Sequence, residues 1–585
     1  MNEKTKTAGG KGGAEISWCR VWLILLAAIF VITCVATLTS PGARPRGGAD
    51  WGRALVFIPG LSALAATALW LVLWLCFHWR RAVFLLACAA TVIALFYAEE
   101  DWRGHHAWNK FRREWEAKGE RFDFASAVPP PVPEDQNFAL TPLVFSSYGQ
   151  MLDRTGHRLQ PRNTNLVARL GMSYWDGGNP PGNLNGWALG EATDLTAFQH
   201  YYQEQAAKTN LFPVPPTPQS PAADVLLALS RLDPTLEELR QDAELPYSRF
   251  PLDYDTENKA AIVLPHLAAL KRCAQVLALR ATAELPTGQS DRALADITLI
   301  QRLTEAIHSE PFLISHLVRI AMVQLALQPV WEGLADHRWT GAQLTALDAD
   351  LAKLDFLTGY KRGMHCELVF QGAHLDYLQM HPGKYLELFN EGGGEGSKMS
   401  AAEGALAILM QLHLAPSGWL YQNRLNCALA MEKYYLPVAD VQSRTFNPAL
   451  ARRGDDYMGN ESRHSTPYNV LARQFLPALG TAGRRFALAQ GDVDLARVAM
   501  ALERYRLAQG RYPGSLDPLA PQYIGEVPHD VIGGQPLHYR LTDDGRFVLY
   551  SVGWNETDDG GVVGLTKGKP PTQDIAKGDW VWRYP

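Results

Sequence analysis

Three uninterrupted apolar segments stand at the start of the chain. They are Val21–Leu38, Ala54–Phe77 and Ala82–Ala98, and none of them contains an Asp, Glu, Lys or Arg residue. At 1.5 Å per residue, a helix over the first segment is about 27 Å long, close to the apolar thickness of a bilayer. His78–Arg81 leaves only a tight turn between the last two segments, which predicts a helical hairpin. Residues 1–100 are therefore expected to form a membrane block with three transmembrane helices.

The presence of three apolar segments argues against a cleaved signal peptide. A cleaved signal peptide has one apolar segment followed by a small-residue cleavage site, which does not fit three segments. A buried helical hairpin in a soluble domain stays open as the other interpretation. Basic residues are nearly balanced between the two sides of the predicted spans, so the positive-inside rule does not fix the orientation.

Residues 101–134 follow as a predicted juxtamembrane helix and a proline-rich linker. Trp108, Phe111 and Trp115 have the spacing of one helical face. Such a face either lies among lipid headgroups or packs on its own domain, and the pattern fits both equally. Val128–Pro133, with the sequence VPPPVP, predicts a stiff extended linker.

Helical periodicity dominates the middle of the chain from about residue 257. The clearest predicted helices are Asn258–Leu285, Ser290–Ser309 and Pro311–Ala335. His316 and Arg319 make the last of these a core helix rather than a membrane span. We expect residues 135–485 to form a large helical domain, either a bundle or a solenoid-like array.

Loops are predicted where Gly, Pro and Asn gather within this region. The segments concerned are Met172–Trp187, Phe212–Pro221 and Glu391–Ser397.

Composition excludes several classes of function. Lys and Arg number 55 and Asp and Glu number 60, so the net charge of −5 provides no electrostatic footprint for nucleic acid. The seven cysteines show no C-x-x-C spacing of a zinc or redox site. The helical region also lacks H-E-x-x-H, G-x-S-x-G and a phosphate-binding glycine loop.

Four carboxylates of the helical region are the candidates for an enzyme. Asp253, Asp255 and Glu257 share one short acidic stretch, and Glu367 lies beside His365 and Cys366. Acids at the start of a helix are also favoured by the helix dipole, and adjacent residues on a helix point in different directions. A hydrolase would require two or more of these groups, or a histidine with one of them, to meet in one cleft with shifted pKa values.

The last hundred residues, 486–585, have a different pattern. A helix is predicted from Asp492 as N-cap to Gln509, where Gly510 stops it. The strand-like runs PLHYRL and RFVLYSVG are joined by Thr542–Gly545, with the sequence TDDG, which predicts a hairpin. The fold class expected for the whole chain is mainly α, with transmembrane helices, a helical domain and a small α+β C-terminal domain with an antiparallel sheet.

Oxygen-bearing side chains crowd the end of the second strand. Asn555, Asp558 and Asp559 precede Gly560 and Gly561. Their mutual repulsion is relieved if the stretch is a solvated turn, or if it holds a hard cation that prefers oxygen ligands. The spacing is not that of an EF-hand.

The order ALERYRLAQGRYP, VPHDVIGGQPLHY, DGRFVLYSVGWN, DDGG and QDIAKGDW resembles the globular domain of the major pseudopilins of type II secretion. The likeness covers about residues 491–580. It implies one bound calcium ion, with Asn555, Asp558, Asp559 and Asp574 at the positions that match the family's acidic loop and tail.

The chain departs from that family in several places. Val531 stands where the family has a proline, Asn555 replaces an aspartate, and Val562–Gln573 is a longer insert. The N-terminal prepilin leader and the single assembly helix with its early glutamate are not found. The rest of the chain is similar to uncharacterised membrane-anchored envelope proteins of bacteria, a likeness that implies no activity.

Together these patterns predict a membrane-anchored envelope protein with a non-catalytic binding or scaffolding role, associated with secretion. Its expected partners are the lipid bilayer and other envelope or pilin-like proteins, without nucleic acid. The pseudopilin resemblance implies a bacterial inner-membrane protein whose large domain is periplasmic, where calcium fills a modest site. The alternative is a hydrolase acting on envelope material through the carboxylates of the helical domain.

Overall fold

The computed structural model describes residues 18–39, 59, 62–74, 79–150, 164–177, 179–209, 211–385, 408–409, 412, 414–461 and 466–584. The chain divides into two compact units, Met1–Glu100 and Asp101–Pro585. Both ends of the second predicted span and the predicted loop Glu391–Ser397 lie outside the described residues.

Apolar helices make up the described part of the first unit. Helix α1 covers Trp18–Thr39, a shorter helix covers Ser62–Trp74, and α3 covers Trp79–Glu116, which begins in this unit and continues into the next. The first two helices are joined by hydrogen bonds from Trp22 Nε1 to Thr67 Oγ1 (3.0 Å) and from Trp70 Nε1 to the Trp18 carbonyl (2.8 Å).

Four described helices are long and apolar enough to cross a membrane, and burial separates them into two classes. The apolar window of α1 is 0% buried and that of α3 is 6% buried. In contrast, 56% of the window in Lys259–Glu284 and 67% of that in Leu313–Ala335 are buried inside the second unit. The predicted core helix around His316 is therefore confirmed, and α1 and α3 are candidate membrane helices. The second predicted span is described only over the shorter helix Ser62–Trp74.

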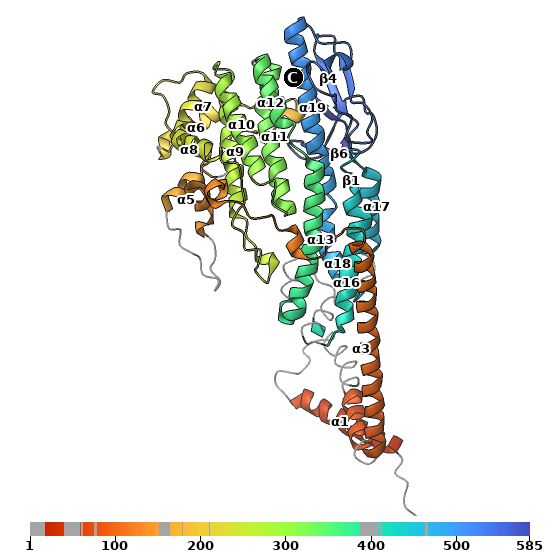
Figure 1. Ribbon diagram of the computed structural model, residues 1–585. Coiled ribbons are helices and arrows are strands. Elements are labelled where there is room, and N and C mark those ends of the chain that lie inside the picture. Colours follow the sequence, from red (N-terminus) through yellow and green to blue (C-terminus); the bar gives the residue numbers. More distant parts are fainter. Residues whose placement is uncertain are drawn as a thin grey trace, which may run out of the picture. The chain divides into compact units, whose positions relative to one another are not determined.

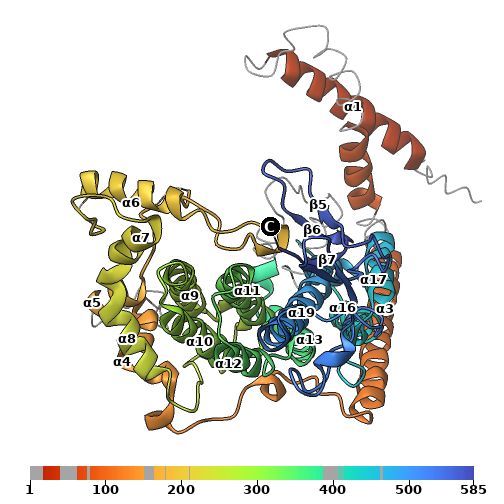
Figure 2. The ribbon, with the colours of Figure 1, turned by 90° about the horizontal axis from the view of Figure 1, so that it is seen from above.

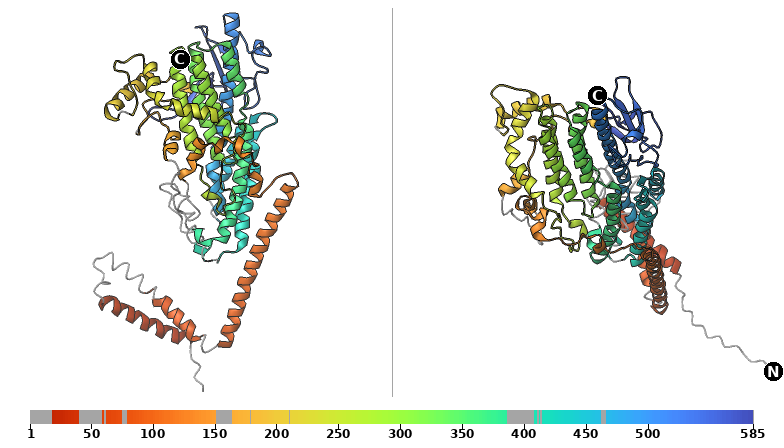
Figure 3. Two further views of the ribbon diagram at one scale, coloured as in Figure 1. Left: turned by 60° about the vertical axis from the view of Figure 1, so that its left-hand side comes forward. Right: turned by 45° about the horizontal axis from the view of Figure 1, so that its top comes forward.

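Helices packed side by side form the main body of the second unit (Figures 1 and 2). Figure 3 shows the same array from two further sides. The central helices are α9 (Pro265–Glu284), α10 (Ser290–Ala306), α11 (Leu313–Ala335), α12 (Gly341–Leu351), α13 (Phe356–Met380) and α19 (Ala482–Gln509). Helices α9, α10 and α11 pack against one another, α11 and α13 pack against α19, and α12 packs against α10 and α19. This confirms the mainly helical fold class.

Shorter helices flank this array on both sides. On one side lie α4 (Pro142–Phe145), α5 (Thr164–Leu170), α6 (Leu195–Thr209), α7 (Pro221–Leu229) and α8 (Asp233–Asp242). On the other lie α16 (Ser417–Ala430), α17 (Pro448–Glu461) and α18 (Val470–Phe475).

Small antiparallel sheets complete the unit near its C-terminus. The strands are β1 (Ala439–Asp440), β2 (Thr445–Phe446), β3 (His538–Leu541), β4 (Phe547–Ser551), β5 (Val563–Leu565), β6 (Gln573–Gly578) and β7 (Trp580–Trp582). The largest sheet has the order β3-β4-β7, with His538 opposite Tyr550 and Tyr550 opposite Val581. The hairpin predicted around Thr542–Gly545 is thus present.

Helix α19 begins earlier than the sequence predicts. It starts at Ala482, so Asp492 lies inside the helix and does not cap it. Gly491 interrupts the sequence pattern, but in the fold its missing side chain makes room for the Trp580 ring, which would lie 3.1 Å from a Cβ there. The helix ends at Gly510 as predicted, with the left-handed φ of 76° that favours glycine. The expected domain boundary between 485 and 486 falls within this helix.

Helix α9 begins later than predicted, at Pro265 rather than Asn258. Proline has no N–H to donate and disfavours helical backbone in the residue before it, so Pro265 opens the helix. Residues 259–261 form a separate 3₁₀ turn, with the Asn258 side chain accepting from Ala260 N.

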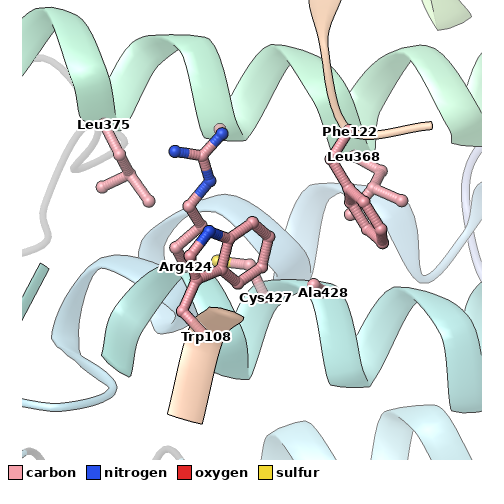
Figure 4. A pocket seen from close by; sticks show the side chains of 8 residues that line it. Trp108, Phe122, Leu368, Leu375, Arg424, Cys427 and Ala428 are labelled. Carbon is pink, nitrogen blue, oxygen red and sulfur yellow. The ribbon is translucent and has the colours of Figure 1, made fainter. Parts of the chain in front are cut away.

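The aromatic stripe after the third apolar segment packs on its own domain. Trp108 and Phe111 are buried, and Trp115 packs against the same core. Figure 4 shows Trp108 beside Arg424 of α16, whose guanidinium lies 4.7 Å from a Trp108 ring centre, with Phe122 and Leu368 nearby. Since the stripe is covered by protein, the headgroup interpretation is wrong for these three residues.

Helices α3 and α16 touch at their backbones. A Cβ built on Gly104 would lie 2.3 Å from the carbonyl oxygen of Gly418 and 2.5 Å from its Cα. Backbone atoms cannot yield as a flexible side chain does, so this contact requires glycine at position 104.

We expect Gly104→Ala to destabilise the second unit by about 2–3 kcal/mol, because the new methyl group overpacks this helix pair. Thermal unfolding of the full chain in detergent measures the effect. Gly341→Ala is the matched control, since a Cβ at Gly341 meets nothing within 4 Å. Equal melting temperatures for the two variants would contradict the close contact.

Candidate functional site

The acidic turn after β4 is organised by a buried carboxylate that sequence reasoning missed. Asp579, between β6 and β7, is fully buried. Its oxygens accept the backbone N–H groups of Asp559 (3.2 Å) and Gly561 (2.6 Å), while its own N–H donates to the Val562 carbonyl (2.8 Å). Burial raises the pKa of Asp579. The turn is thus held to the tail by one side chain, next to Trp580 in the sequence.

The predicted calcium ligands have the following positions. Asn555 Nδ2 donates to Asp559 Oδ2 (2.8 Å), so these two side chains meet. Asp558 Oδ1 accepts Gly560 N (2.9 Å) and the Tyr550 hydroxyl (3.1 Å), and these hydrogen bonds hold its pKa below the usual range.

Asp574 lies on β6 and has other partners. Its carboxylate is 3.1 Å from Lys577 Nζ, and this contact lowers its pKa. Asp574 Oδ1 also accepts Ala576 N (3.1 Å). A cation at this position would compete with the lysine.

The fit to a hard cation is therefore partial. Asn555, Asp558 and Asp559 present oxygen atoms from one exposed turn, which is the donor type that calcium prefers. Within the described ranges, no group of three or more His, Cys, Asp or Glu side chains is close enough to hold a metal ion.

The four carboxylates of the hydrolase alternative do not form a cleft with one another. Asp253, Asp255 and Glu257 are exposed, and Glu257 lies 3.7 Å from His381. Glu367 is half-buried on α13, and desolvation raises its pKa to about 7.

The neighbours of Glu367 point away from it, as expected for adjacent helical residues. His365 Nδ1 lies 3.8 Å from Glu120, whereas Cys366 is buried in the core, where burial raises its pKa. No hydrogen bond joins these three side chains to one another in the described structure. Cys366 is therefore a structural cysteine.

A buried polar chain runs through the array without access for a substrate. The Tyr148 hydroxyl is 2.7 Å from His266 Nδ1, and His266 Nε2 is 2.6 Å from Glu310 Oε1. Ser315 Oγ donates to the other oxygen of Glu310. Each of the four residues is 5% exposed or less, so they act as an internal tie between helices.

A second polar cluster is likewise internally paired. Arg280 contacts Asp233, Glu284 and Asp296, and Arg240 Nη2 lies 2.8 Å from Asp296. A cavity of about 310 Å³ opens beside it. Its positive charges already have carboxylate partners, which leaves no free cationic site for an anion among them.

A groove of about 640 Å³ lies between a loop and two helices, and amide side chains predominate in its polar lining. Its polar lining consists of the amide side chains of Asn183, Asn185, Gln275 and Gln324, together with Lys271. Its other lining residues are Tyr174, Pro180, Gly182, Leu184, Ala321 and Leu325. We call this set the amide groove.

The loop wall of the amide groove is held rigidly by α11. Gln328 Oε1 accepts Gly186 N and Trp187 N, both at 2.8 Å, and its Nε2 donates to the Glu191 carbonyl (3.0 Å). One turn later, Glu332 Oε1 accepts the backbone and hydroxyl groups of Thr193 at 3.0 and 2.8 Å.

Apolar contacts anchor the same loop. Trp187 is buried and its ring lies 5.2 Å from that of Trp582 on β7. A Cβ on Gly182 would approach the Phe198 ring to 2.8 Å, so the loop lies close against α6. The sequence described this stretch only as turn material, because its partners are distant in the chain.

A buried carboxylate supports the floor of the groove. Gln324 Nε2 donates to Asp492 Oδ2 of α19 at 2.6 Å. Burial raises the pKa of Asp492 to about 7. Gln324 therefore has one face in the groove and its amide nitrogen tied to the core.

Comparison with protein-family models, curated proteins and solved structures finds no match to this chain.

Because the pKa of Asp492 is raised, we expect Asp492→Asn to stabilise the fold by an amount that depends on pH. The folded pKa is about 7, above the value near 4 of an unfolded aspartate, so the folded state holds an extra proton between these limits. The contribution of Asp492 to the stability of the unmodified chain therefore falls as pH rises from about 4 to 7.

Asn accepts the Gln324 hydrogen bond without ionising, so the variant gains up to about 4 kcal/mol by pH 8 and almost nothing at pH 4. Unfolding measured across this pH range checks the prediction. Asp543→Asn, an exposed hairpin residue, is the control and shows a flat difference. If the stability difference between Asp492→Asn and the unmodified chain did not change with pH, the prediction would be contradicted.

Proposed function

We propose that this chain is a membrane-anchored protein with a non-catalytic binding or scaffolding role, and that the amide groove is its binding site. The observation that carries the proposal is the composition of the groove, where four amide side chains outnumber the two ionisable ones, Lys271 and Tyr174. Catalysis of hydrolysis uses a positioned acid, base or nucleophile, whereas amide side chains bind without reacting.

Amide groups both donate and accept hydrogen bonds, so they match ligands that carry many hydroxyl and amide groups. Pro180, Leu184 and Leu325 add apolar surface beside them. This combination suits a neutral glycan, whose hydroxyl groups need two-way hydrogen bonds and whose C–H faces pack on apolar side chains.

The rigidity of the wall supports binding rather than a moving lid. Because Gln328 and Glu332 satisfy the loop's backbone groups before a ligand arrives, little ordering free energy is lost on association. The ligand would meet a preformed surface.

The setting proposed for this activity is the bacterial cell envelope, with the second unit on the periplasmic side of the inner membrane. The support is the pseudopilin resemblance of residues 491–580 and the exposed apolar windows of α1 and α3. Association with secretion components or other pilin-like proteins belongs to the same proposal.

The proposal includes a calcium ion beside the C-terminal sheet. The ion would be held by Asn555, Asp558 and Asp559, and by Asp574 once its contact with Lys577 is broken. When bound, the ion would stabilise the folded chain by mass action and would take no part in a reaction.

We expect a neutral oligosaccharide of N-acetylglucosamine to bind the full chain in detergent, and Asn183→Ala with Asn185→Ala to weaken this binding at least tenfold, or about 1.4 kcal/mol. Isothermal titration calorimetry provides the measurement. Gln241→Ala, an exposed amide outside the groove, is the matched control. Equal affinities in all variants, or no affinity for any neutral glycan, would refute the groove as the glycan site.

We expect calcium to raise the melting temperature of the full chain. At a calcium concentration ten times the dissociation constant, the free energy of unfolding should increase by about 1.4 kcal/mol. Asp559→Asn abolishes the rise, because it removes a charged ligand from the turn, and Asp543→Asn leaves it intact. A rise of equal size in both variants would place calcium elsewhere, and no rise at millimolar calcium would leave the turn metal-free.

A further inference from the structure

Helices α3 and α16 run in parallel from one end of the second unit. Asp101 Oδ1 accepts Ser417 Oγ (3.0 Å) and Gly418 N (2.8 Å). Further along, the His105 and Tyr421 rings lie 3.8 Å apart, and Arg424 lies over Trp108. Each step along α3 therefore matches a step in the same direction along α16.

This parallel course fixes where the residues before α16 lie. They are at the end of the unit where the chain enters at Asp101. Asp101 follows the expected span Ala82–Ala98 by three residues, about 4.5 Å along a helix. The chain therefore leaves a bilayer that holds Ala82–Ala98 only a few residues before it enters this end of the second unit.

The residues just before α16 expose large apolar side chains. The exposed fractions are 51% for Ile408, 38% for Leu409, 59% for Leu412 and 51% for Leu414. Leu412 N donates to the Ile408 carbonyl (2.9 Å) and Leu414 N to the Leu409 carbonyl (2.8 Å). We call these four side chains the Ile408–Leu414 surface.

Other exposed apolar groups belong to the same end. Trp102, 66% exposed, follows Asp101 directly. Met380, 60% exposed, ends α13, whose Leu375 and Leu378 share a small core with Ala415 and Trp419 of the α16 region. Tryptophan is enriched where lipid headgroups meet acyl chains.

The sequence around this surface has the length of an interfacial segment. Gly404–Ala415 contains no Asp, Glu, Lys or Arg, but its 12 residues are too few to cross a bilayer, which takes about 20. An apolar stretch that is too short to cross a bilayer and is exposed fits an interfacial segment.

We propose that the Ile408–Leu414 surface inserts into the bilayer that holds Ala82–Ala98, as a second membrane contact made by the folded body itself. The occupant of this apolar surface is phospholipid, because chain connectivity brings the membrane to the end that exposes it. The inference rests on the proposed membrane anchorage and is independent of the amide groove.

Photo-cross-linking to lipid tests the contact. Benzoylphenylalanine is placed at position 412 of the full chain, reconstituted into vesicles of phosphatidylethanolamine and phosphatidylglycerol, and peptide–lipid adducts are measured by mass spectrometry after illumination. The matched control is the same group at position 565, where Leu565 on β5 is 52% exposed. We expect adducts at 412 to exceed those at 565 several-fold.

Equal yields at the two positions, or cross-links from 412 to protein alone, would overturn the proposal. Flotation of the same sample with the vesicles tests the anchorage separately, so a lost second contact is distinguishable from a chain that is not anchored. Hydrogen–deuterium exchange provides a second measurement. In vesicles, Leu412→Glu should increase exchange in residues 408–416 and leave α9 unchanged, and an unchanged 408–416 would also overturn the proposal.

Discussion

The burial of α19 is the constraint on which the rest of the second unit depends. This helix packs against α11, α12 and α13 on the side of the array and against β4, β6 and β7 on the side of the sheet. Its Gln490 accepts the Phe356 N–H (3.0 Å) at the start of α13, and Gly491 receives the Trp580 ring. A helix with two covered sides cannot be removed without exposing both cores, so the C-terminal sheet and the helical array share one hydrophobic core.

The amide groove depends indirectly on the buried position of α19. Gln324, Gln328 and Glu332 follow one another at four-residue spacing on α11, so they lie along one helical face. The first is tied to Asp492 of α19 and the other two hold the loop wall. Because each of these polar side chains is buried or half-buried, an unmet hydrogen bond would be costly, and the groove is fixed by the same bonds that stabilise the fold.

Local patterns in the sequence predicted the elements but not the sites. Apolar runs identified the candidate membrane helices α1 and α3, helical periodicity identified the array, and TDDG and Gly510 identified a hairpin and a helix end. Two boundaries were wrong for physical reasons, since Pro265 opens a helix and Gly491 serves packing inside one. Asp579 and the groove residues could not be found this way, because their partners are brought close only by the fold. The acidic residues after β4 were visible, but their hydrogen bonds to Tyr550 and to each other were not.

Apolar side chains near a membrane span illustrate the limit of periodicity most clearly. Trp108 and Phe111 have the regular spacing of an interfacial helix, yet they are buried, because α16 and Phe122 cover them. Leu412 stands in a short apolar stretch of the sequence, yet it is exposed. Both lie close to α3 or to the helix paired with it, so distance from the span does not separate them. What separates them is whether a neighbouring element covers the face. An apolar face that the fold covers contributes to stability, whereas one that it leaves open beside the entry of a membrane helix is available to lipid.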